Sequence, residues 1–240
     1  MQDVGGNFVK PEKQIENTNM KIATWNVERL KHKSKLDRIH FLIDELNADI
    51  LVLTETDERI KPSNFKYRID TPKLTEIEPE YYVETENRIS IFTNYEIVKQ
   101  FETYDKYTSL CVELKTEFGN LKVYGTIIGI YGNRNENFNI DLTKQIEDFE
   151  NLSKENNLCV IGDYNISFAD NYYFTNFGRD ELNKSFDKNN LELVTRPKEQ
   201  CIDHVAISKS FIENTQKEIV EWNEDKKLAD HKGIYIELKR

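Results

Sequence analysis

Short apolar runs that stop abruptly at a polar side chain are the feature that most constrains how this chain can fold. Such runs are typical of strands buried on both faces, and α/β folds place chemistry where these strands end. The polar residues beside the runs are carboxylates, carboxamides and imidazoles: Asn26, Glu55, Asp163, Asn165, Asp203, His204, Asp230 and His231. One acid at a strand end is usually a turn or cap residue. Because these residues hold similar positions beside several strands, the sequence predicts one shared polar site.

The apolar pattern predicts both helices and strands. Residues 35–46 place most of their apolar side chains on one helical face, with Ser34 and Asp37 as a capping pair, and a second helix is expected around residues 142–152. The expected strands lie at residues 21–27, 48–58, 81–85, 88–94, 109–116, 121–132, 158–163, 191–194, 201–208 and 233–238. A hairpin turn is expected at residues 119–120. This order favours an α+β fold of two mixed, mostly antiparallel sheets with helices outside and one core.

Length and composition are consistent with one folded domain. The chain has 240 residues, 38% of them hydrophobic, and its 13 Phe and 12 Tyr supply enough apolar surface for a core. Residues 21–240 contain no internal repeat and no linker rich in Pro, Gly or Ser, so we expect one domain there. Residues 1–20 are polar and aperiodic and are expected to form a flexible leader.

Charge and cysteine content narrow the partners and the compartment. The 33 Lys and Arg residues against 43 Asp and Glu residues give a net charge of −10, which argues against a broad basic surface for nucleic acid but permits a local cationic strip. The 3 Cys residues are widely spaced and form no CxxC pair, so neither a disulfide framework nor a zinc site of that type is expected. Since there is no apolar run of about 18 residues and no hydrophobic signal segment, we expect a cytoplasmic protein without a membrane span.

The polar residues at the strand ends are the ligand types that a hard divalent cation prefers. Mg²⁺ binds carboxylate and amide oxygens and keeps several waters, so it needs few protein ligands when a phosphate completes its shell. Mn²⁺ can substitute, whereas Zn²⁺ is not favoured because no paired His or Cys spacing is present. Hydrolysis of a phosphoester also needs a carboxylate that deprotonates water and an imidazole that stabilises charge. The residue types thus point to metal-assisted phosphoester chemistry.

The order of the motifs resembles one family. The segments KIATWNVERL, DILVLTETDE, VIGDYN, CIDHVAIS and ADHKG are similar, in this order, to the motifs of the endonuclease/exonuclease/phosphatase superfamily. The resemblance covers roughly residues 20–240, and GDYN combined with ADHKG is its most specific part. It implies a DNase I-like fold, which is a four-layer α/β sandwich of two mixed, mostly antiparallel sheets flanked by helices. It also implies a Mg²⁺-dependent phosphoesterase.

The resemblance implies a role for each matching acid or amide. Glu55 is similar to the family's principal metal carboxylate, with Asn26 beside it and Asp230 close to the same ion. Asp163 resembles the residue that orients or deprotonates the attacking water, and Asn165 resembles one that hydrogen-bonds the scissile phosphate. Two other acids near these positions, Glu28 and Asp57, are expected to be solvated loop residues.

Two histidines lie beside predicted strands: His231 has a counterpart in the family, and His204 has two interpretations. His231 is similar to the imidazole that contacts phosphate, and Asp203 to the carboxylate that holds this imidazole charged and oriented. His204 is either a strand residue that packs near the site or a catalytic residue.

One position departs from the family pattern. Many members carry a His or Tyr that touches phosphate in the strand before the second helix, where this chain has Ile127. Tyr131, Asn133 or Arg134 in the following loop is a candidate substitute donor. Alternatively, Ile127 indicates weak activity or an unusual substrate.

Two stretches are candidates for substrate binding. The loop after Asn26 carries Arg29 and Lys31, which either contact a phosphate backbone or form a solvated lead-in to the helix. The segment after GDYN carries Tyr172 and Arg179, which either contribute to stacking of an unpaired base or pack the next helix. Neither stretch distinguishes DNA from RNA.

A Mg²⁺-dependent nuclease acting on DNA or RNA is therefore the first functional prediction. A phosphatase or phosphodiesterase for a small phosphorylated molecule is the alternative, because the two share a fold and a mechanism and differ in their loops. A catalytically silent binding module of the same fold is a third hypothesis, for which Ile127 is the support.

Overall fold

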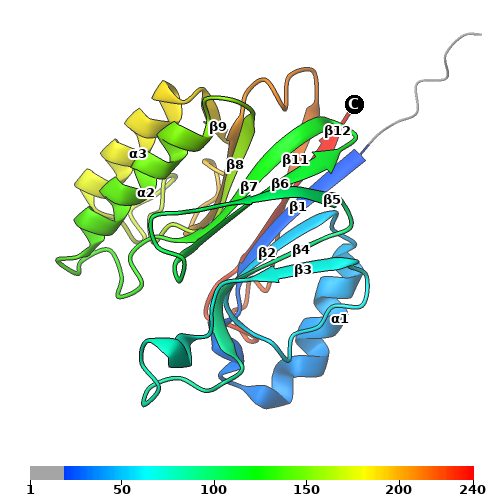
Figure 1. Ribbon diagram of the computed structural model, residues 1–240, viewed down its shortest axis with the longest axis vertical. Coiled ribbons are helices and arrows are strands. Elements are labelled where there is room, and N and C mark those ends of the chain that lie inside the picture. Colours follow the sequence, from blue (N-terminus) through cyan, green and yellow to red (C-terminus); the bar gives the residue numbers. More distant parts are fainter. Residues whose placement is uncertain (1–18) are drawn as a thin grey trace, which may run out of the picture.

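Two β-sheets of 6 strands each pack face to face in residues 19–240, the residues that this computed structural model describes (Figure 1). Their strand orders are β11-β12-β1-β2-β4-β3 and β5-β6-β7-β8-β10-β9. The strands are β1 (Asn19–Asn26), β2 (Ile50–Asp57), β3 (Tyr67–Asp70), β4 (Glu86–Thr93), β5 (Glu96–Phe101), β6 (Ser109–Thr116), β7 (Gly119–Ile127), β8 (Asn157–Asp163), β9 (Leu191–Leu193), β10 (Asp203–Ser208), β11 (Gln216–Trp222) and β12 (Gly233–Lys239). The helices are α1 (Leu36–Leu46), α2 (Phe138–Leu152) and α3 (Asn176–Lys188), with short 3-10 helices η1 (Glu28–Leu30), η2 (Lys33–Lys35) and η3 (Leu74–Glu76).

Helices cover the outer face of each sheet. α1 packs on the first sheet through Ile39 and Ile43, whereas α2 and α3 pack on the second through Phe149 and Phe186. Figure 1 shows α1 on one side of the molecule and α2 and α3 on the other, with the sheets between them. The predicted α+β sandwich of four layers is therefore confirmed. No helix in the described part of the chain is long and apolar enough to span a bilayer.

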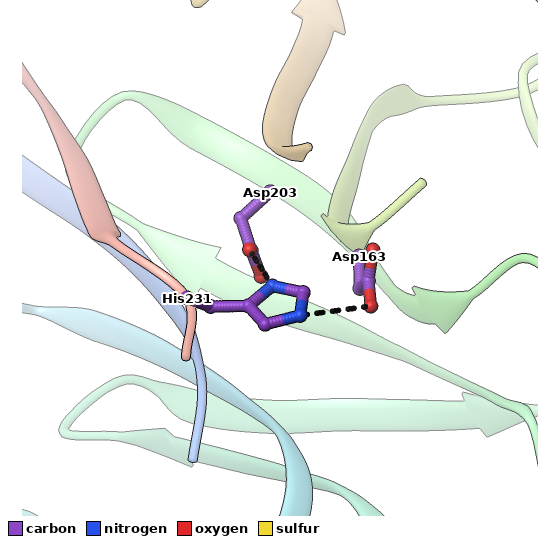
Figure 2. Close-up of side chains that lie close together, drawn as sticks. All are labelled: Asp163, Asp203 and His231. Atoms are coloured by element: carbon purple, nitrogen blue, oxygen red, sulfur yellow. Dashed lines mark hydrogen bonds and ion pairs between the residues drawn. The ribbon is translucent and has the colours of Figure 1, made fainter. Parts of the chain in front are cut away.

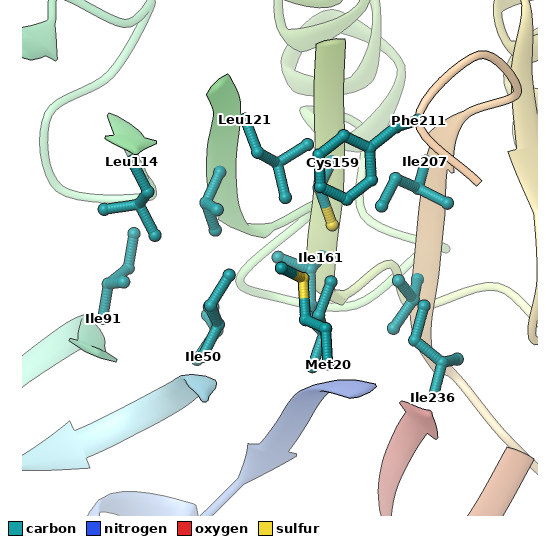
Figure 3. Packing of buried hydrophobic residues seen from close by; sticks show 14 of the residues in the cluster. Met20, Ile50, Ile91, Leu114, Leu121, Cys159, Ile161, Ile207, Phe211 and Ile236 are labelled. Atoms are coloured by element: carbon teal, nitrogen blue, oxygen red, sulfur yellow. The ribbon is translucent and has the colours of Figure 1, made fainter. Parts of the chain in front are cut away.

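The central strands are buried on both faces, which explains their nearly continuous apolar sequences. In β1, Ile22 lies between the sheets and Trp25 packs in the cluster that contains α1. In β8, Ile161 lies between the sheets and Val160 packs with α2 and α3. Figure 3 shows side chains from the two sheets meeting in the inter-sheet core, among them Met20, Ile50, Leu121, Ile161, Ile207 and Ile236. Each such side chain stabilises the fold by about 1.5–3 kcal/mol.

Strand direction brings the polar strand ends to one edge of the molecule. β1 and β2 are parallel, as are β7 and β8, so Asn26 and Asp163 end strands that run to this edge. β10 is antiparallel to β8, with Asp203 opposite Asp163. β12 is antiparallel to β1, so its first residue, Gly233, lies near the same edge.

The strands that the sequence does not predict lie at sheet edges. β3 and β11 are the outer strands of the first sheet, and β5 is an outer strand of the second. Most side chains of β5 are exposed, and β11 begins with exposed residues. Edge strands keep polar side chains in contact with solvent, so they lack the apolar runs that mark the central strands.

The strand predicted at residues 81–85 is wrong. These residues form turns, and β4 begins at Glu86, whose N–H donates to the carbonyl of Val83 at 2.9 Å. β3 occupies the place beside β4 that another strand would take. Of the aromatic and β-branched residues that favoured a strand, Tyr81 and Val83 are exposed, whereas Tyr82 and Thr85 are half-buried.

Local details of two predicted elements also differ. α1 follows Lys35 and has no side-chain cap, so the predicted Ser34 capping pair is wrong. The hairpin between β6 and β7 is present, but its turn lies at residues 117–118 and Gly119 already belongs to β7. Most of the predicted leader, residues 1–18, lies outside the described residues, while Met20 is buried in β1.

Replacement of Gly162 is expected to test how closely β7 and β8 approach. Gly162 has φ +138°, and an added Cβ would lie 2.1 Å from the carbonyl oxygen of Thr126. Gly162→Ala should therefore lower the free energy of unfolding by roughly 3 kcal/mol or more. Gly119→Ala is the matched control, because Gly119 has φ +107° but open space around it, and should cost only about 1 kcal/mol. Urea unfolding measures both, and equal losses would contradict the close approach.

Candidate active site

Asp163, Asp203 and His231 converge at the shared strand edge (Figure 2). Asp163 ends β8, Asp203 begins β10, and His231 lies in the loop before β12. Nδ1 of His231 lies 2.6 Å from Oδ2 of Asp203, and Nε2 lies 4.0 Å from Oδ2 of Asp163. Both carboxylates are buried, whereas the imidazole is 14% exposed. The imidazole is therefore the group through which this cluster reaches solvent.

The backbone of His231 is held by two side chains, one in β1 and one directly after β11. Nε1 of Trp25 and Nδ2 of Asn223 donate to the His231 carbonyl at 3.1 and 2.7 Å. The Trp222 ring packs on Gly233, where an added Cβ would lie 1.9 Å from the ring. These contacts fix the loop, so the direction of the imidazole does not depend on Asp203 alone.

The charges of the cluster favour a protonated imidazole. Burial lowers the pKa of His231, but the attraction of the Asp203 and Asp163 carboxylates outweighs this effect and raises the pKa to about 10. Burial is also the main cause that raises the pKa of Asp163, and repulsion by Asp203 and Glu55 adds to it. Oδ1 of Asp203 is buried and has no hydrogen-bond partner among residues 19–240. The site thus contains more negative charge than its own cation neutralises.

Two amides support Asp163. Nδ2 of Asn26 donates to Oδ2 of Asp163 at 3.2 Å, and the backbone N–H of Asn165 donates to Oδ1 at 2.9 Å. The side-chain Nδ2 of Asn165 donates to the carbonyls of Ile128 and Gly129 at 3.0 and 3.2 Å. The structure therefore brings Asn165 to the site, although its side-chain nitrogen already has partners there.

Three further residues near the cluster carry oxygen atoms of the kind that bind a hard cation. Glu55 near the end of β2 is 28% exposed and has φ 43°, a strained value for a residue with a side chain. Asp230 is 67% exposed, and its Oδ1 lies 3.9 Å from Nε2 of His231. Oδ1 of Asn26 accepts from the N–H of Glu28 at 3.0 Å and keeps a second lone pair. Together with the excess negative charge, this donor set fits a hard divalent cation such as Mg²⁺ or Mn²⁺.

Asp163, Asp203 and His231 also lie close enough to surround an ion, since their ligand atoms lie within 4.8 Å of one another. However, the Nδ1 proton of His231 already occupies the space between the imidazole and Asp203. A protonated imidazole repels a cation. This hydrogen-bonded cluster is therefore less suited to a cation than the oxygen atoms of Glu55, Asn26 and Asp230, which we call the candidate cation site.

The predicted substrate-binding residues take different places. Arg29 lies at the site, with Nε 3.5 Å from Glu55. Lys31 is exposed and pairs with Glu28 at 3.0 Å, and Arg134 is exposed in the loop after β7. Arg179 faces inward: its guanidinium donates to backbone carbonyls of the loop at residues 167–170 and lies 3.8 Å from the Phe174 ring centroid. Arg179 therefore holds this loop rather than facing the site.

Tyr172 lines a pocket of about 570 Å³ beside His231 and Asp203. Two cations that the sequence interpretation missed, Lys226 and Lys232, line the same pocket. Nζ of Lys226 donates to the Tyr172 hydroxyl at 2.9 Å. Their position shortly before and after the ADH motif was the available sequence signal.

The interpretation of His204 is settled by its surroundings. Its ring is fully buried, Nδ1 lies 2.9 Å from the Thr195 hydroxyl, and Nε2 lies within 3.1 Å of the carbonyls of Ile166 and Cys201. Burial lowers its pKa to about 4. His204 is therefore neutral and packs beneath the site, as the first of its two interpretations stated.

Asp57 and Ile127 are also buried. Asp57 is not the expected solvated acid, because its carboxylate accepts from Arg59 and, at 2.7 Å, from the Thr85 hydroxyl. Ile127 lies opposite Asp163 in the parallel β7–β8 pair and is 1% exposed. Of its suggested substitutes, Asn133 is buried and donates to the Asn165 carbonyl at 2.6 Å, while Tyr131 is exposed.

Comparison with known proteins supports the fold through structure and not through sequence. No protein-family model matches the chain, and no curated protein matches it. The 3' phosphatase NExo from Neisseria, bound to a product DNA hairpin, is similar with a TM-score of 0.68 and 16% identity over 91% of this chain and 99% of that chain. An AP endonuclease from Archaeoglobus fulgidus is similar with a TM-score of 0.67 and 15% identity, over 90% of this chain and 98% of that chain. Humanized TDP2 from D. rerio has a TM-score of 0.63 and 11% identity, with 92% and 98% covered.

These likenesses, together with the two sheets and their flanking helices, define the fold of the protein. The chain has the DNase I-like fold of the endonuclease/exonuclease/phosphatase superfamily. The family resemblance of the sequence motifs is thereby confirmed at the level of the fold.

His204→Gln is expected to make the free energy of unfolding depend less on pH at acidic pH. Because the folded chain keeps His204 neutral, the unfolded chain takes up a proton there first as the pH falls below about 6.5. Wild type should lose roughly 2–3 kcal/mol of unfolding free energy from this residue between about pH 6.5 and about pH 4.5, and none above that window. Urea unfolding across this range should show the gap between wild type and variant shrinking by that amount. A gap independent of pH would mean that His204 is not held neutral.

Proposed function

We propose that this protein is a divalent-metal-dependent phosphodiesterase that hydrolyses DNA or RNA. The observation that carries the proposal is the buried Asp203–His231–Asp163 cluster beside the oxygen donors of Glu55, Asn26 and Asp230. The similar solved structures include an AP endonuclease and a phosphatase bound to a DNA hairpin, which supports a phosphate ester as the substrate class.

Asp163 is positioned to act as the general base. Its raised pKa makes the carboxylate a stronger proton acceptor than an exposed aspartate, while its amide partners hold it toward the site. A water held by Asp163 would lose a proton to its carboxylate as the water oxygen attacks phosphorus. The P–O bond to the leaving oxygen would break, and the leaving alkoxide would take up a proton from solvent.

His231 is positioned to stabilise the charge that develops on the phosphate. Asp203 accepts the Nδ1 proton, so the Nε2–H of the imidazolium is left to donate to a phosphate oxygen. Glu55, Asn26 and Asp230 would hold the cation. Such an ion supplies Lewis-acid stabilisation of the phosphate and the leaving group.

A small phosphorylated molecule is the second candidate substrate. The pocket beside His231 has a volume of about 570 Å³, which is in the range of small-molecule binding sites. Lys226 and Lys232 line it and supply positive charge that suits a phosphate. A phosphatase or phosphodiesterase acting on such a molecule would use the same Asp163 and His231 chemistry.

A substrate panel is expected to separate these activities. Single- and double-stranded DNA, abasic-site DNA, RNA, an inositol polyphosphate and bis-nitrophenyl phosphate would be incubated with Mg²⁺, Mn²⁺ or EDTA. We expect metal-dependent cleavage of a nucleic acid, lowered at least ~10²-fold in Asp163→Asn because the base is lost. Asp187→Asn, an exposed residue of α3, should behave as wild type. Turnover of small esters alone would favour the second candidate, and no turnover would favour a silent binding module.

Glu55→Gln is expected to abolish metal binding and activity together. The substitution neutralises the proposed main ligand, so the rise in Tm that Mg²⁺ gives to wild type should disappear. Glu58→Gln is the matched control, because Glu58 lies close in sequence but pairs with Lys73 at 2.7 Å. Melting in EDTA corrects for the lost Arg29 contact. An unchanged response of Tm to Mg²⁺ would reject Glu55 as the ligand.

A further inference from the structure

A hollow of about 470 Å³ lies beside the candidate cation site and has no part in the chemistry above. It is lined by Arg29, Glu78, Tyr81, Tyr82 and Tyr131, and we call it the tyrosine hollow. Tyr81 is 74% exposed and Tyr131 is 60% exposed, the highest values among the large hydrophobic side chains of residues 19–240. Because three tyrosines gather in one hollow beside Arg29 and Glu78, they form an aromatic patch with polar neighbours, and such a patch favours a binding surface.

The rings and side chains of the tyrosine hollow are tied to polar partners. The Arg29 and Arg88 guanidinium carbons lie 5.4 and 5.5 Å from the Tyr82 ring centroid, and Nη2 of Arg88 donates to the Tyr82 hydroxyl at 3.1 Å. The Tyr131 hydroxyl donates to Glu78 at 3.4 Å. Because these partners fix the Tyr82 and Tyr131 rings in place, the hollow is already formed in the absence of a ligand.

The tyrosine hollow is connected to the candidate cation site. Arg29 contacts both the Tyr82 ring and, at 3.5 Å, the Glu55 carboxylate. The segment that carries Tyr81 and Tyr82 is anchored just after Glu55, because the Thr85 hydroxyl donates to Asp57 at 2.7 Å. The backbone N–H of Glu58 also donates to the Thr85 carbonyl at 2.7 Å. A ligand group in the hollow would therefore lie next to a phosphate bound at Glu55.

The chemistry of the hollow favours a base rather than a phosphate. Glu78 would repel a phosphate but can accept from the amino group of a base, while tyrosine rings and Arg29 offer stacking faces. In a duplex, stacking covers the faces of a base and pairing covers its hydrogen-bonding edge, so a base in the hollow must be unstacked and unpaired. A net charge of −10 also disfavours affinity from a long series of phosphate contacts, which a duplex binder would need.

We infer that the tyrosine hollow binds an unpaired nucleobase next to the scissile phosphate, so that single-stranded or locally unpaired nucleic acid is the preferred substrate. This inference rests on the proposed function and narrows it. The sequence did not indicate it, because residues 81–85 were expected to form a strand.

Alanine substitution of the exposed rings tests the inference. Single-stranded DNA and RNA oligonucleotides, their duplexes and bis-nitrophenyl phosphate would be given to wild type, Tyr81→Ala and Tyr131→Ala. We expect a KM for the single strand raised roughly 5- to 100-fold in both variants, as loss of one stacked base gives. In Tyr81→Ala, kcat/KM for the small diester should stay within about twofold of wild type. Tyr81→Phe should restore the wild-type KM. Phe41→Ala, which removes an exposed ring on α1, is the control.

A base-deletion scan gives the second readout. One nucleotide of the single strand at a time is replaced by an abasic analogue. Wild type should lose affinity when the base at one position beside the cleaved bond is removed. Tyr81→Ala already lacks the stacking ring, so removal of the same base should lower its affinity little further. Wild-type KM values in both tyrosine variants, or faster cleavage of the duplex than of the single strand, would overturn the inference.

Binding in EDTA, followed by fluorescence anisotropy of the labelled single strand, separates this inference from the proposed function. If wild type cleaves no diester but binds the strand, and Tyr81→Ala binds it more weakly, the proposed function fails and the base site stands. If wild type cleaves the strand and the tyrosine variants match it in KM and binding, the base site alone fails. Neither cleavage nor binding would overturn both.

Discussion

Burial of β1, β2, β7 and β8 on both faces is the constraint on which the rest of this structure depends. The β1–β2 and β7–β8 pairs are parallel, so each needs a crossover, and the crossovers contain α1 and α2. The helices cover the outer faces while the sheets cover each other, which makes four layers around the central strands. Parallel pairing also sends the carboxyl ends of each pair to the same edge. The position of the candidate active site is thus a consequence of how the core is buried.

Several acidic residues lie at this edge, at the carboxyl ends of the central strands, where they are partly or fully buried from water. Burial raises the pKa of Asp163, whereas at Asp57 the hydrogen bonds from Arg59 and Thr85 outweigh burial and lower the pKa. These two aspartates end neighbouring central strands of different sheets, but Asp57 is hydrogen-bonded to the Arg59 guanidinium, whereas the imidazole of His231 lies 4.0 Å from Asp163. A satisfied pair stabilises local structure, while an unsatisfied one is available for chemistry. This contrast explains why Asp163, and not Asp57, belongs to the candidate site.

The central part of the fold was predictable because buried strands leave long apolar runs, as in residues 158–163. β3, β5 and β11 were not predictable because they lie at sheet edges, where many side chains face solvent and few need to be apolar. The strand predicted at residues 81–85 was wrong for the opposite reason. Its tyrosines are typical strand residues, but in the structure Tyr81 is an exposed ring and Tyr82 is half-buried against Arg88. Arg179 shows a similar limit, since a cation among aromatic residues can face a ligand or hold its own loop.

The sequence by itself determined which polar groups follow each apolar run, and therefore the stock of carboxylates, amides and imidazoles at the strand ends. Only the tertiary structure decided which of them meet. His204 and His231 both follow an aspartate, yet His204 is neutral between Tyr164 and Phe168, while His231 is held at the surface by Asp203. The reason is that side chains alternate along β10: Asp203 faces the site, so His204 must face the packed side. His231 lies before β12 in a loop free of that alternation, and its partners come from β1, β8 and β10. Contacts across such distances in the chain leave no local pattern in the sequence.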